Sequence, residues 1–142
     1  MEHLIHYAMS FVGTPYVYGG NSPLAGLDCS GYVLELLRSV GLWDKTDATA
    51  QDIFNKMEKA HSHVPFMREG CLVFFGKSVT QISHIAFAID AHRFLEAGGG
   101  DSTTTSLERA VAKNAFVRMR HRKSRSDIVA VLKLDLSTIG LV

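Results

Sequence analysis

The spacing of apolar residues changes near the middle of the chain, and this change constrains the fold more than any other feature of the sequence. In the first 60 or so residues apolar side chains recur three and four positions apart, the spacing of helices with one buried face. From Cys71 onward they form short continuous or alternating runs, which are typical of strands. Helices followed by strands is the order of an α+β domain, so we expect N-terminal helices packed on a C-terminal antiparallel sheet.

Three helices are expected in the first half. Their apolar faces are Ile5, Ala8, Met9 and Val12 in the first, Val33, Leu36, Leu37 and Val40 in the second, and Ala50, Ile53, Phe54 and Met57 in the third. The first ends near Val12, because Pro15 lacks a backbone donor. The second spans residues 32–40, and the third is capped by Thr46, Asp47 or Thr49. Residues 16–27 are rich in Gly, Ser, Asn and Pro and are expected to form a loop.

Five strands are expected in the second half, at residues 71–75, 84–89, 93–96, 115–120 and 128–134. The polar stretch 98–106 is interpreted as a long loop. A chain of 142 residues with 46% apolar and 20% charged residues fits one globular domain, residues 1–142.

Charge and cysteine content exclude several classes of protein. A formal net charge of +1 gives no global field that would recruit nucleic acid. Two cysteines, Cys29 and Cys71, do not make a disulfide framework, so both are expected to be free thiols. His61 and His63 lack a matching cluster of ligands, so no metal site is expected. No leader peptide or membrane span is visible, and the cellular location stays open.

Cys29 is the first candidate for chemistry. A thiol attacks as its thiolate, and an ordinary free cysteine is mostly protonated at neutral pH. Cys29 precedes the second predicted helix, where unpaired backbone N–H groups and the helix dipole favour negative charge. The same N–H groups could stabilise an oxyanion. The alternative interpretation is a small buried cysteine that packs a helix end.

His84 is the candidate base, and Glu96 the candidate residue that orients it. His84 opens a strand on which Ala86 and Ala88 share its face, and these small neighbours leave room beside the imidazole. A turn at residues 90–92 would fold the next strand back and bring Glu96 near His84. The alternatives are a structural histidine and a surface glutamate at a strand end.

Four ordered blocks of sequence resemble the NlpC family of cell-wall cysteine peptidases, which have a compact papain-like α+β fold. They lie at residues 13–20 (GTPYVYGG), 27–33 (LDCSGYV), 70–75 (GCLVFF) and 83–85 (SHI), within a resemblance that covers residues 8–134. The resemblance implies that Cys29 is the nucleophile, His84 the base and Glu96 the third polar residue of the site.

The resemblance also implies a substrate and its binding residues. Tyr16 corresponds to the active-site tyrosine of the family, and Asp28 and Ser30 would help to bind the free amine of a stem peptide. The implied reaction is hydrolysis of a peptide bond in peptidoglycan, at the γ-D-glutamyl to diaminopimelate bond, without a cofactor. A related thiol amidase or acyltransferase and a phage tail module with an unused site are the alternatives.

The sequence departs from the family pattern at three positions. Glu96 stands where histidine is common, Tyr18 where tryptophan is usual, and Cys71 where aspartate is usual; we interpret Cys71 as a buried thiol at a strand start.

The residues that follow Glu96 are similar to those of phage-encoded members of the family, which favours phage tail or lysis partners. A basic run, Arg118, Arg120, Arg122, Lys123 and Arg125, is either a solvated strand and turn or a contact for anionic wall polymer.

Overall fold

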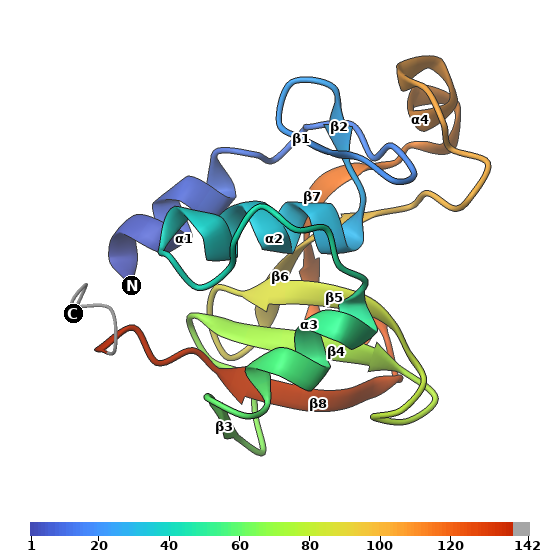
Figure 1. Cartoon of the computed structure of the whole chain (residues 1–142). Coiled ribbons are helices and arrows are strands. Elements are labelled where there is room, and N and C mark those ends of the chain that lie inside the picture. The colour runs from blue at the N-terminus through green and yellow to red at the C-terminus, as the bar shows by residue number, and fades with distance from the viewer. Residues whose placement is uncertain (138–142) are drawn as a thin grey trace.

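The computed structural model describes residues 1–137 and contains helices packed on an antiparallel sheet (Figure 1). The helices are α1 (Glu2–Met9), α2 (Cys29–Ser39), α3 (Ala50–Met57) and α4 (Leu107–Lys113). The main sheet contains β3 (Ser62–His63), β4 (Cys71–Gly76), β5 (Ile82–Ala88), β6 (Arg93–Gly98), β7 (Phe116–His121) and β8 (Ile128–Lys133), in the order β3-β8-β4-β5-β6-β7. Strands β1 (Asn21–Ser22) and β2 (Gly26–Leu27) form a separate pair, and a 3₁₀ turn (Arg122–Ser124) follows β7.

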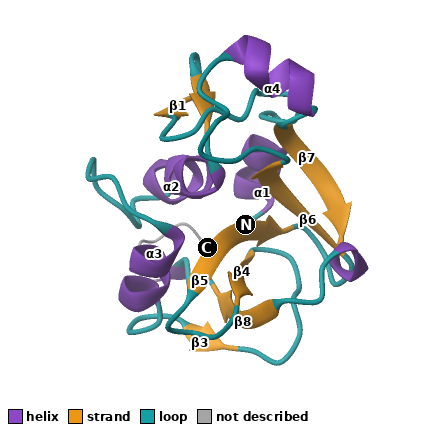
Figure 2. Ribbon diagram, turned by 90° about the vertical axis from the view of Figure 1, so that its right-hand side faces the viewer, coloured by secondary structure: helices purple, strands orange, loops and turns teal. Residues whose placement is uncertain are grey.

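The sheet separates two groups of buried side chains. Successive residues of a strand point to opposite faces, so Leu72 and Phe74 of β4 lie in the larger group, whereas Val73 and Phe75 lie in the smaller one. The larger group fills the space between the helices and the sheet, where α2 and α3 contact β5 and α1 contacts α2 (Figure 2). The buried faces of α2 and α3 therefore fix both helices against the middle of the sheet.

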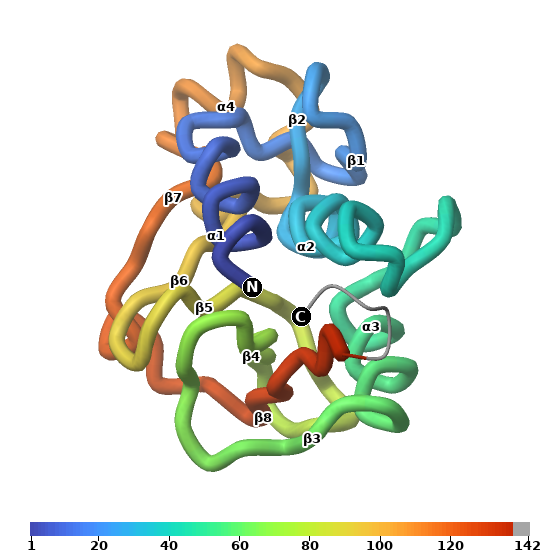
Figure 3. Tube along the Cα trace, turned by 90° about the vertical axis from the view of Figure 1, so that its left-hand side faces the viewer, coloured from blue at the N-terminus to red at the C-terminus, as the bar shows by residue number. Residues whose placement is uncertain are grey.

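The loop-rich end of the molecule contains α4 and the β1–β2 pair, which lie near one another in all three views (Figures 1–3). The Tyr18 N–H donates to the Thr104 carbonyl and joins the two segments. Strand β7 runs beside β6 at the edge of the sheet (Figure 3). This arrangement puts the residues around Tyr16 close to the loop after β6.

The predicted α+β fold, with N-terminal helices on a C-terminal antiparallel sheet, is confirmed. All five predicted strands exist, with ends that differ by one or two residues. The last five residues of the predicted domain, 138–142, lie outside the described residues. None of the helices within residues 1–137 has the length and apolar character needed to cross a bilayer.

Several details were wrong. The first helix ends at Met9 rather than near Val12, and α2 begins at Cys29 itself rather than at residue 32. Helix α4 was missed because its only buried residue is Ala110, so it has no apolar stripe. The loop predicted at 16–27 contains the two-residue strands β1 and β2, whose length is too short for a periodic pattern.

Thr49 caps α3 through a reciprocal pair of hydrogen bonds. Its hydroxyl accepts from the Asp52 N–H at 3.1 Å, and the Asp52 carboxylate accepts from the Thr49 N–H at 3.1 Å. We expect Thr49→Ala to lower the free energy of unfolding by about 1 kcal/mol, because a helix cap is lost. Urea unfolding measures this change, with Thr105→Ala at an exposed loop position as the matched control. An equal effect of the two changes would contradict the capping role.

Candidate active site

Asp28 ends the loop and begins α2, and this cap positions Cys29. The Asp28 Oδ1 accepts from the Gly31 N–H at 2.7 Å and from the Ser30 hydroxyl at 3.2 Å. A side chain at Gly31 would collide with the Gly20 carbonyl, so the loop packs directly against the first turn of the helix. Cys29 is the first residue of α2 and is partly exposed. Its sulfur therefore lies where the helix dipole favours negative charge.

His84 and Glu96 form an ion pair beside this helix start. The His84 Nε2 lies 2.8 Å from the Glu96 Oε1, and the side chains are 12% and 2% exposed. Burial opposes ionisation of Glu96, but His84 and Arg118 outweigh it and lower the pKa of Glu96 to about 2. An ionised carboxylate only accepts hydrogen bonds, so the His84 Nε2 carries the proton and donates it. The other ring nitrogen, Nδ1, is left for Cys29.

The protonated form of His84 is favoured by its surroundings. Burial opposes protonation of the ring, but interactions with Cys29 and Glu96 outweigh it and raise the pKa of His84 to about 9. The ring also packs against Phe75, with the ring centroids 5.2 Å apart. The imidazole is therefore held in one orientation by a carboxylate on one side and an aromatic ring on another.

Two arginines of β7 share the Glu96 carboxylate with His84. Glu96 and Arg118 are cross-strand partners, and the Arg118 Nε donates to the Glu96 Oε2 at 3.0 Å. The Arg120 Nη1 lies 3.5 Å from the same oxygen. These side chains are 31% and 32% exposed, so they lie at the border between the buried carboxylate and solvent. This part of the basic run therefore pairs with Glu96 at the edge of the cleft, and a contact with anionic wall polymer stays a prediction.

Tyr16 lines the same cleft as the arginines. Burial, followed by the nearby Cys29 and Asp28, raises the pKa of Tyr16 to about 12, so the phenol keeps its proton at neutral pH. The loop after β6 approaches the ring closely, and a side chain at Gly100 would overlap the Tyr16 ring. Glycine at this position therefore lets the ring and the loop form one wall of the site.

These side chains surround a cleft of about 330 Å³. Its lining consists of Tyr16, Cys29, Ser83, His84, Glu96, Ala97, Gly98, Gly99, Gly100, Asp101, Arg118, Arg120 and Arg125. A thiol at a helix start, an imidazole and a buried carboxylate in one cleft are the groups that nucleophilic acyl transfer requires. Within residues 1–137, no group of three or more His, Cys, Asp or Glu residues is arranged to hold a metal ion.

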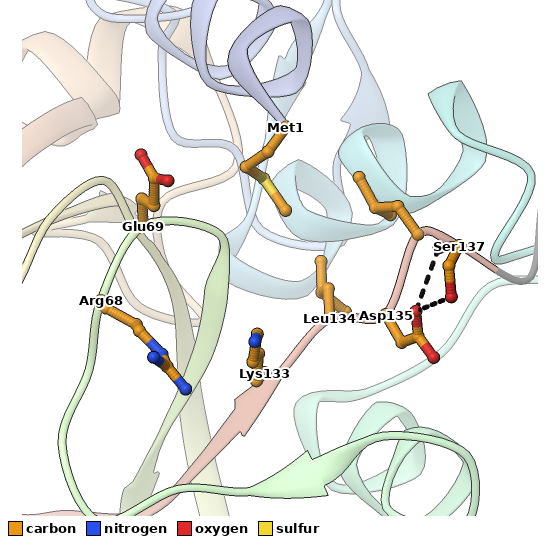
Figure 4. A pocket seen from close by; sticks show the side chains of 8 residues that line it. Met1, Arg68, Glu69, Lys133, Leu134, Asp135 and Ser137 are labelled. Carbon is orange, nitrogen blue, oxygen red and sulfur yellow. Dashed lines mark hydrogen bonds between the residues drawn. The ribbon is translucent and has the colours of Figure 1, made fainter. Parts of the chain in front are cut away.

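A second hollow, of about 360 Å³, lies between Met1 and the end of β8 (Figure 4). Arg68, Glu69 and Lys133 surround it, together with residues 134–137. It contains neither cysteine nor histidine, so it lacks the groups for nucleophilic catalysis. The cleft at Cys29 is therefore the better candidate of the two for an active site.

The structure brings four of the six predicted site residues into that cleft: Tyr16, Cys29, His84 and Glu96. Asp28 and Ser30 adjoin Cys29 but are engaged in capping α2 and do not line the cleft. Cys71 is a buried free thiol at the start of β4, and burial raises its pKa. Arg118 and Arg120 were missed as site residues; their alternation on one face of a predicted strand was the available signal.

The sequence model described as "NlpC/P60 family" matches residues 13–121, which include all of these residues. The chain belongs to the NlpC/P60 family. Its curated relatives include the Gamma-DL-glutamyl hydrolase of Bacillus subtilis, 30% identical in an alignment 105 residues long that covers 72% of this chain and 24% of the relative. The Peptidoglycan endopeptidase RipA of Mycolicibacterium smegmatis is 30% identical in an alignment 109 residues long that covers 68% of this chain and 21% of the relative. The chain thus spans well under half of the length of these relatives.

Solved structures of the NlpC/P60 family share the fold. The NlpC/p60 domain of the peptidoglycan hydrolase SagA superposes with a TM-score of 0.68 and 22% identity, covering 92% of this chain and 96% of that one. The peptidoglycan hydrolase RipB of Mycobacterium tuberculosis gives a TM-score of 0.68 and 24% identity, covering 94% and 63%. The four sequence blocks implied the fold of this family, and the superpositions show that the chain has it.

Proposed function

We propose that this chain is a catalytic domain of the cysteine peptidase kind and that it hydrolyses peptide bonds in peptidoglycan stem peptides. Cys29 is the nucleophile, His84 the general base and acid, and Glu96 the residue that orients the imidazole. The observation that carries the proposal is the alignment of Cys29, His84 and Glu96 in one cleft, with the sulfur at the start of α2. Membership of the NlpC/P60 family supports it.

In the first half of the reaction the Cys29 sulfur attacks the peptide carbonyl carbon, and the thiol proton is held by His84. The carbonyl oxygen becomes an oxyanion, which backbone N–H groups at the start of α2 can stabilise. The tetrahedral intermediate collapses when His84 gives its proton to the leaving amine, which breaks the C–N bond and leaves a thioester on Cys29. Glu96 stabilises the imidazolium throughout, because it stays ionised.

In the second half His84, now neutral, takes a proton from water, and the hydroxide attacks the thioester carbonyl. Collapse of this intermediate breaks the C–S bond, and His84 returns its proton to the sulfur or holds it as the imidazolium. The acid product leaves and the starting site is restored. All the groups that these steps use belong to the chain and to water, and the proposal requires no cofactor.

We propose the γ-D-glutamyl to diaminopimelate bond as the bond that is cut. The name of the Bacillus subtilis relative, a Gamma-DL-glutamyl hydrolase, and that of RipA, a peptidoglycan endopeptidase, support this choice. Asp28 and Ser30, which adjoin Cys29, are proposed to bind the free amine of the stem peptide. Phage tail or lysis proteins as partners stay a prediction.

Digestion of purified peptidoglycan, followed by mass spectrometry, tests this function. We expect new stem-peptide fragments with the intact protein and none with the Cys29→Ala protein. Fragments that end at D-glutamate would identify the bond. The same fragments from both proteins would contradict Cys29 as the nucleophile.

Two other functions predict different products. A thiol amidase would hydrolyse a different acyl group to its free acid, whereas an acyltransferase would give a product in which the acyl group is joined to a new acceptor. A phage tail module with an unused site would yield no product from any wall type and would leave Cys29 unreactive toward iodoacetamide.

Tyr16 is proposed to donate its phenolic proton to the oxyanion. Since its pKa is raised to about 12, the phenol is a donor throughout the working range of pH. We expect Tyr16→Phe to lower kcat by about 10²- to 10³-fold with a smaller change in KM, as for loss of one oxyanion donor. Steady-state kinetics on a synthetic stem peptide measure the two constants. Tyr18→Phe is the matched control, because Tyr18 is 56% exposed, and an equal loss in both variants would contradict the role.

A further inference from the structure

The cleft carries more positive charge than its own carboxylates neutralise. Arg118, Arg120 and Arg125 line it. The two lining carboxylates are Glu96 and Asp101. Because the net charge of the whole chain is only +1, this excess is a local property of the cleft.

The partners of the cations differ in a way that singles out Arg120. Arg118 donates to Glu96 at 3.0 Å. Arg125 forms a bidentate pair with Asp127, at 2.9 and 2.7 Å, and its guanidinium lies 4.6 Å from the centre of the Phe75 ring. Asp101 is paired with Lys113 at 2.7 Å. Arg120 has one ionic contact among the described residues, at 3.5 Å to an oxygen already bonded to Arg118. Its donors are therefore available to a ligand.

We propose that Arg120 binds a carboxylate on the leaving residue of the substrate, the residue whose amine is released; this rests on the proposed peptidase function. His84 protonates that amine, and Glu96 lies on the ring nitrogen that does not face Cys29. Arg120 contacts Glu96 and lines the cleft, so its guanidinium lies beside the imidazole that must meet the leaving amine. Arg118 lies two residues before Arg120 on the same face of β7 and is the cross-strand partner of Glu96. Because Arg118 holds the Glu96 carboxylate, Arg120 can engage the substrate.

This subsite selects a substrate class. A guanidinium pairs with a carboxylate through two parallel hydrogen bonds, and it cannot form an equivalent charged pair with a carboxamide. A peptide whose leaving residue carries free carboxylates is therefore the expected substrate, and its amidated form is expected to bind more weakly. The difference amounts to about 10- to 100-fold, the size of a charge-assisted hydrogen bond.

Binding to the Cys29→Ala protein tests the subsite without catalysis. The probes are L-Ala-γ-D-Glu-diaminopimelate with free carboxylates on diaminopimelate and the same peptide with those carboxylates amidated. Isothermal titration calorimetry is expected to give a dissociation constant about 10- to 100-fold lower for the free form. Arg120→Gln in this background is expected to bring the ratio of the two constants to within about 3-fold. Arg120→Lys keeps the positive charge but loses the two parallel donors of the guanidinium, so it is expected to give an intermediate ratio.

Lys123→Gln is the matched control, because it removes one positive charge at an exposed position outside the cleft and should leave the ratio unchanged. Equal binding of the two peptides, no detectable binding of either, or an unchanged ratio in Arg120→Gln would overturn the proposal. Failure of the peptidase function is a separate result: the protein with Cys29 intact would cleave neither peptide, while the binding ratio would persist in the Cys29→Ala protein.

Discussion

The Cys29→Ala protein is expected to retain its fold and to lose about 10⁴- to 10⁶-fold in kcat/KM on a synthetic stem peptide. Removal of the sulfur leaves the cleft, the helix start and His84 in place but removes the atom that is proposed to form the thioester. Hydrolysis would then depend on direct attack by water. The loss should appear in kcat rather than in KM, because the change does not touch the groups proposed to bind the peptide.

Cys71→Ala is the matched control for this prediction. It is the same substitution at the other free cysteine, which is fully buried at the start of β4 and does not line the cleft. We expect this variant to lose stability through a small cavity and to keep kcat/KM within a few-fold of the wild type while folded. A comparable loss of turnover in both variants, with intact circular dichroism spectra, would contradict the assignment of the nucleophile.

Glu96→Gln is expected to lower kcat/KM by about 10²- to 10⁴-fold; the upper value is the loss known for the equivalent carboxylate of a serine protease. The amide keeps the shape of the side chain but loses the charge that favours the imidazolium. It can also present an N–H to the His84 Nε2, which would reverse the hydrogen bond and favour the wrong tautomer. The partly exposed guanidinium of Arg118 would lose its anionic partner as well.

The same variant has a signature in the pH profile. The raised pKa of His84, about 9, predicts that kcat/KM of the wild type falls as the imidazolium loses its proton above about pH 9. Glu96 contributes to that raised value, so its replacement lowers the pKa of His84 and moves the alkaline limb to lower pH. The apparent pKa of the alkaline limb is a property of the coupled Cys29–His84 pair rather than of one residue. The test is therefore the direction in which this apparent pKa moves in Glu96→Gln.

Glu58→Gln is the control for the pH profile. Glu58 forms a Glu–His pair with His63 at 3.0 Å, but this pair is on the surface, with side chains 46% and 50% exposed. Such exposed pairs contribute little, so the profile and the rate should match the wild type. An alkaline limb that stays in place in Glu96→Gln would argue that this carboxylate does not act through His84.

The helices and strands could be predicted because their buried faces repeat at regular spacing. Ile53, Phe54 and Met57 are buried on α3, and Val73 and Phe75 alternate with Leu72 and Phe74 on β4. Helix α4 has no such pattern, since Leu107 and Val111 are 58% and 60% exposed and only Ala110 is buried. Periodicity predicts an element only where a neighbour covers one of its faces.

The site was predictable in its sequence-local parts. A helix that begins close to Cys29 follows from the apolar face after it, although its first residue was placed three positions too late. The approach of Glu96 to His84 follows from a short turn between β5 and β6. The contact between Glu96 and Arg118 depends instead on the register between β6 and β7, which are joined by residues 99–115 and α4. Alternation on each strand leaves that register open, because a shift by two residues preserves every buried face.

The parts of the cleft come from segments far apart along the chain: Cys29 from α2, His84 from β5, Glu96 from β6, and Arg118 with Arg120 from β7. A ribosome synthesises them in that order, so a growing chain contains the thiol long before it contains β7, the strand whose arginines contact the Glu96 carboxylate. Nascent and partly folded chains would therefore carry a cysteine without its assembled imidazole–carboxylate partner. The chain would therefore become able to hydrolyse peptide bonds only when its last strands have folded, and incomplete chains would be inactive in the cell that makes them.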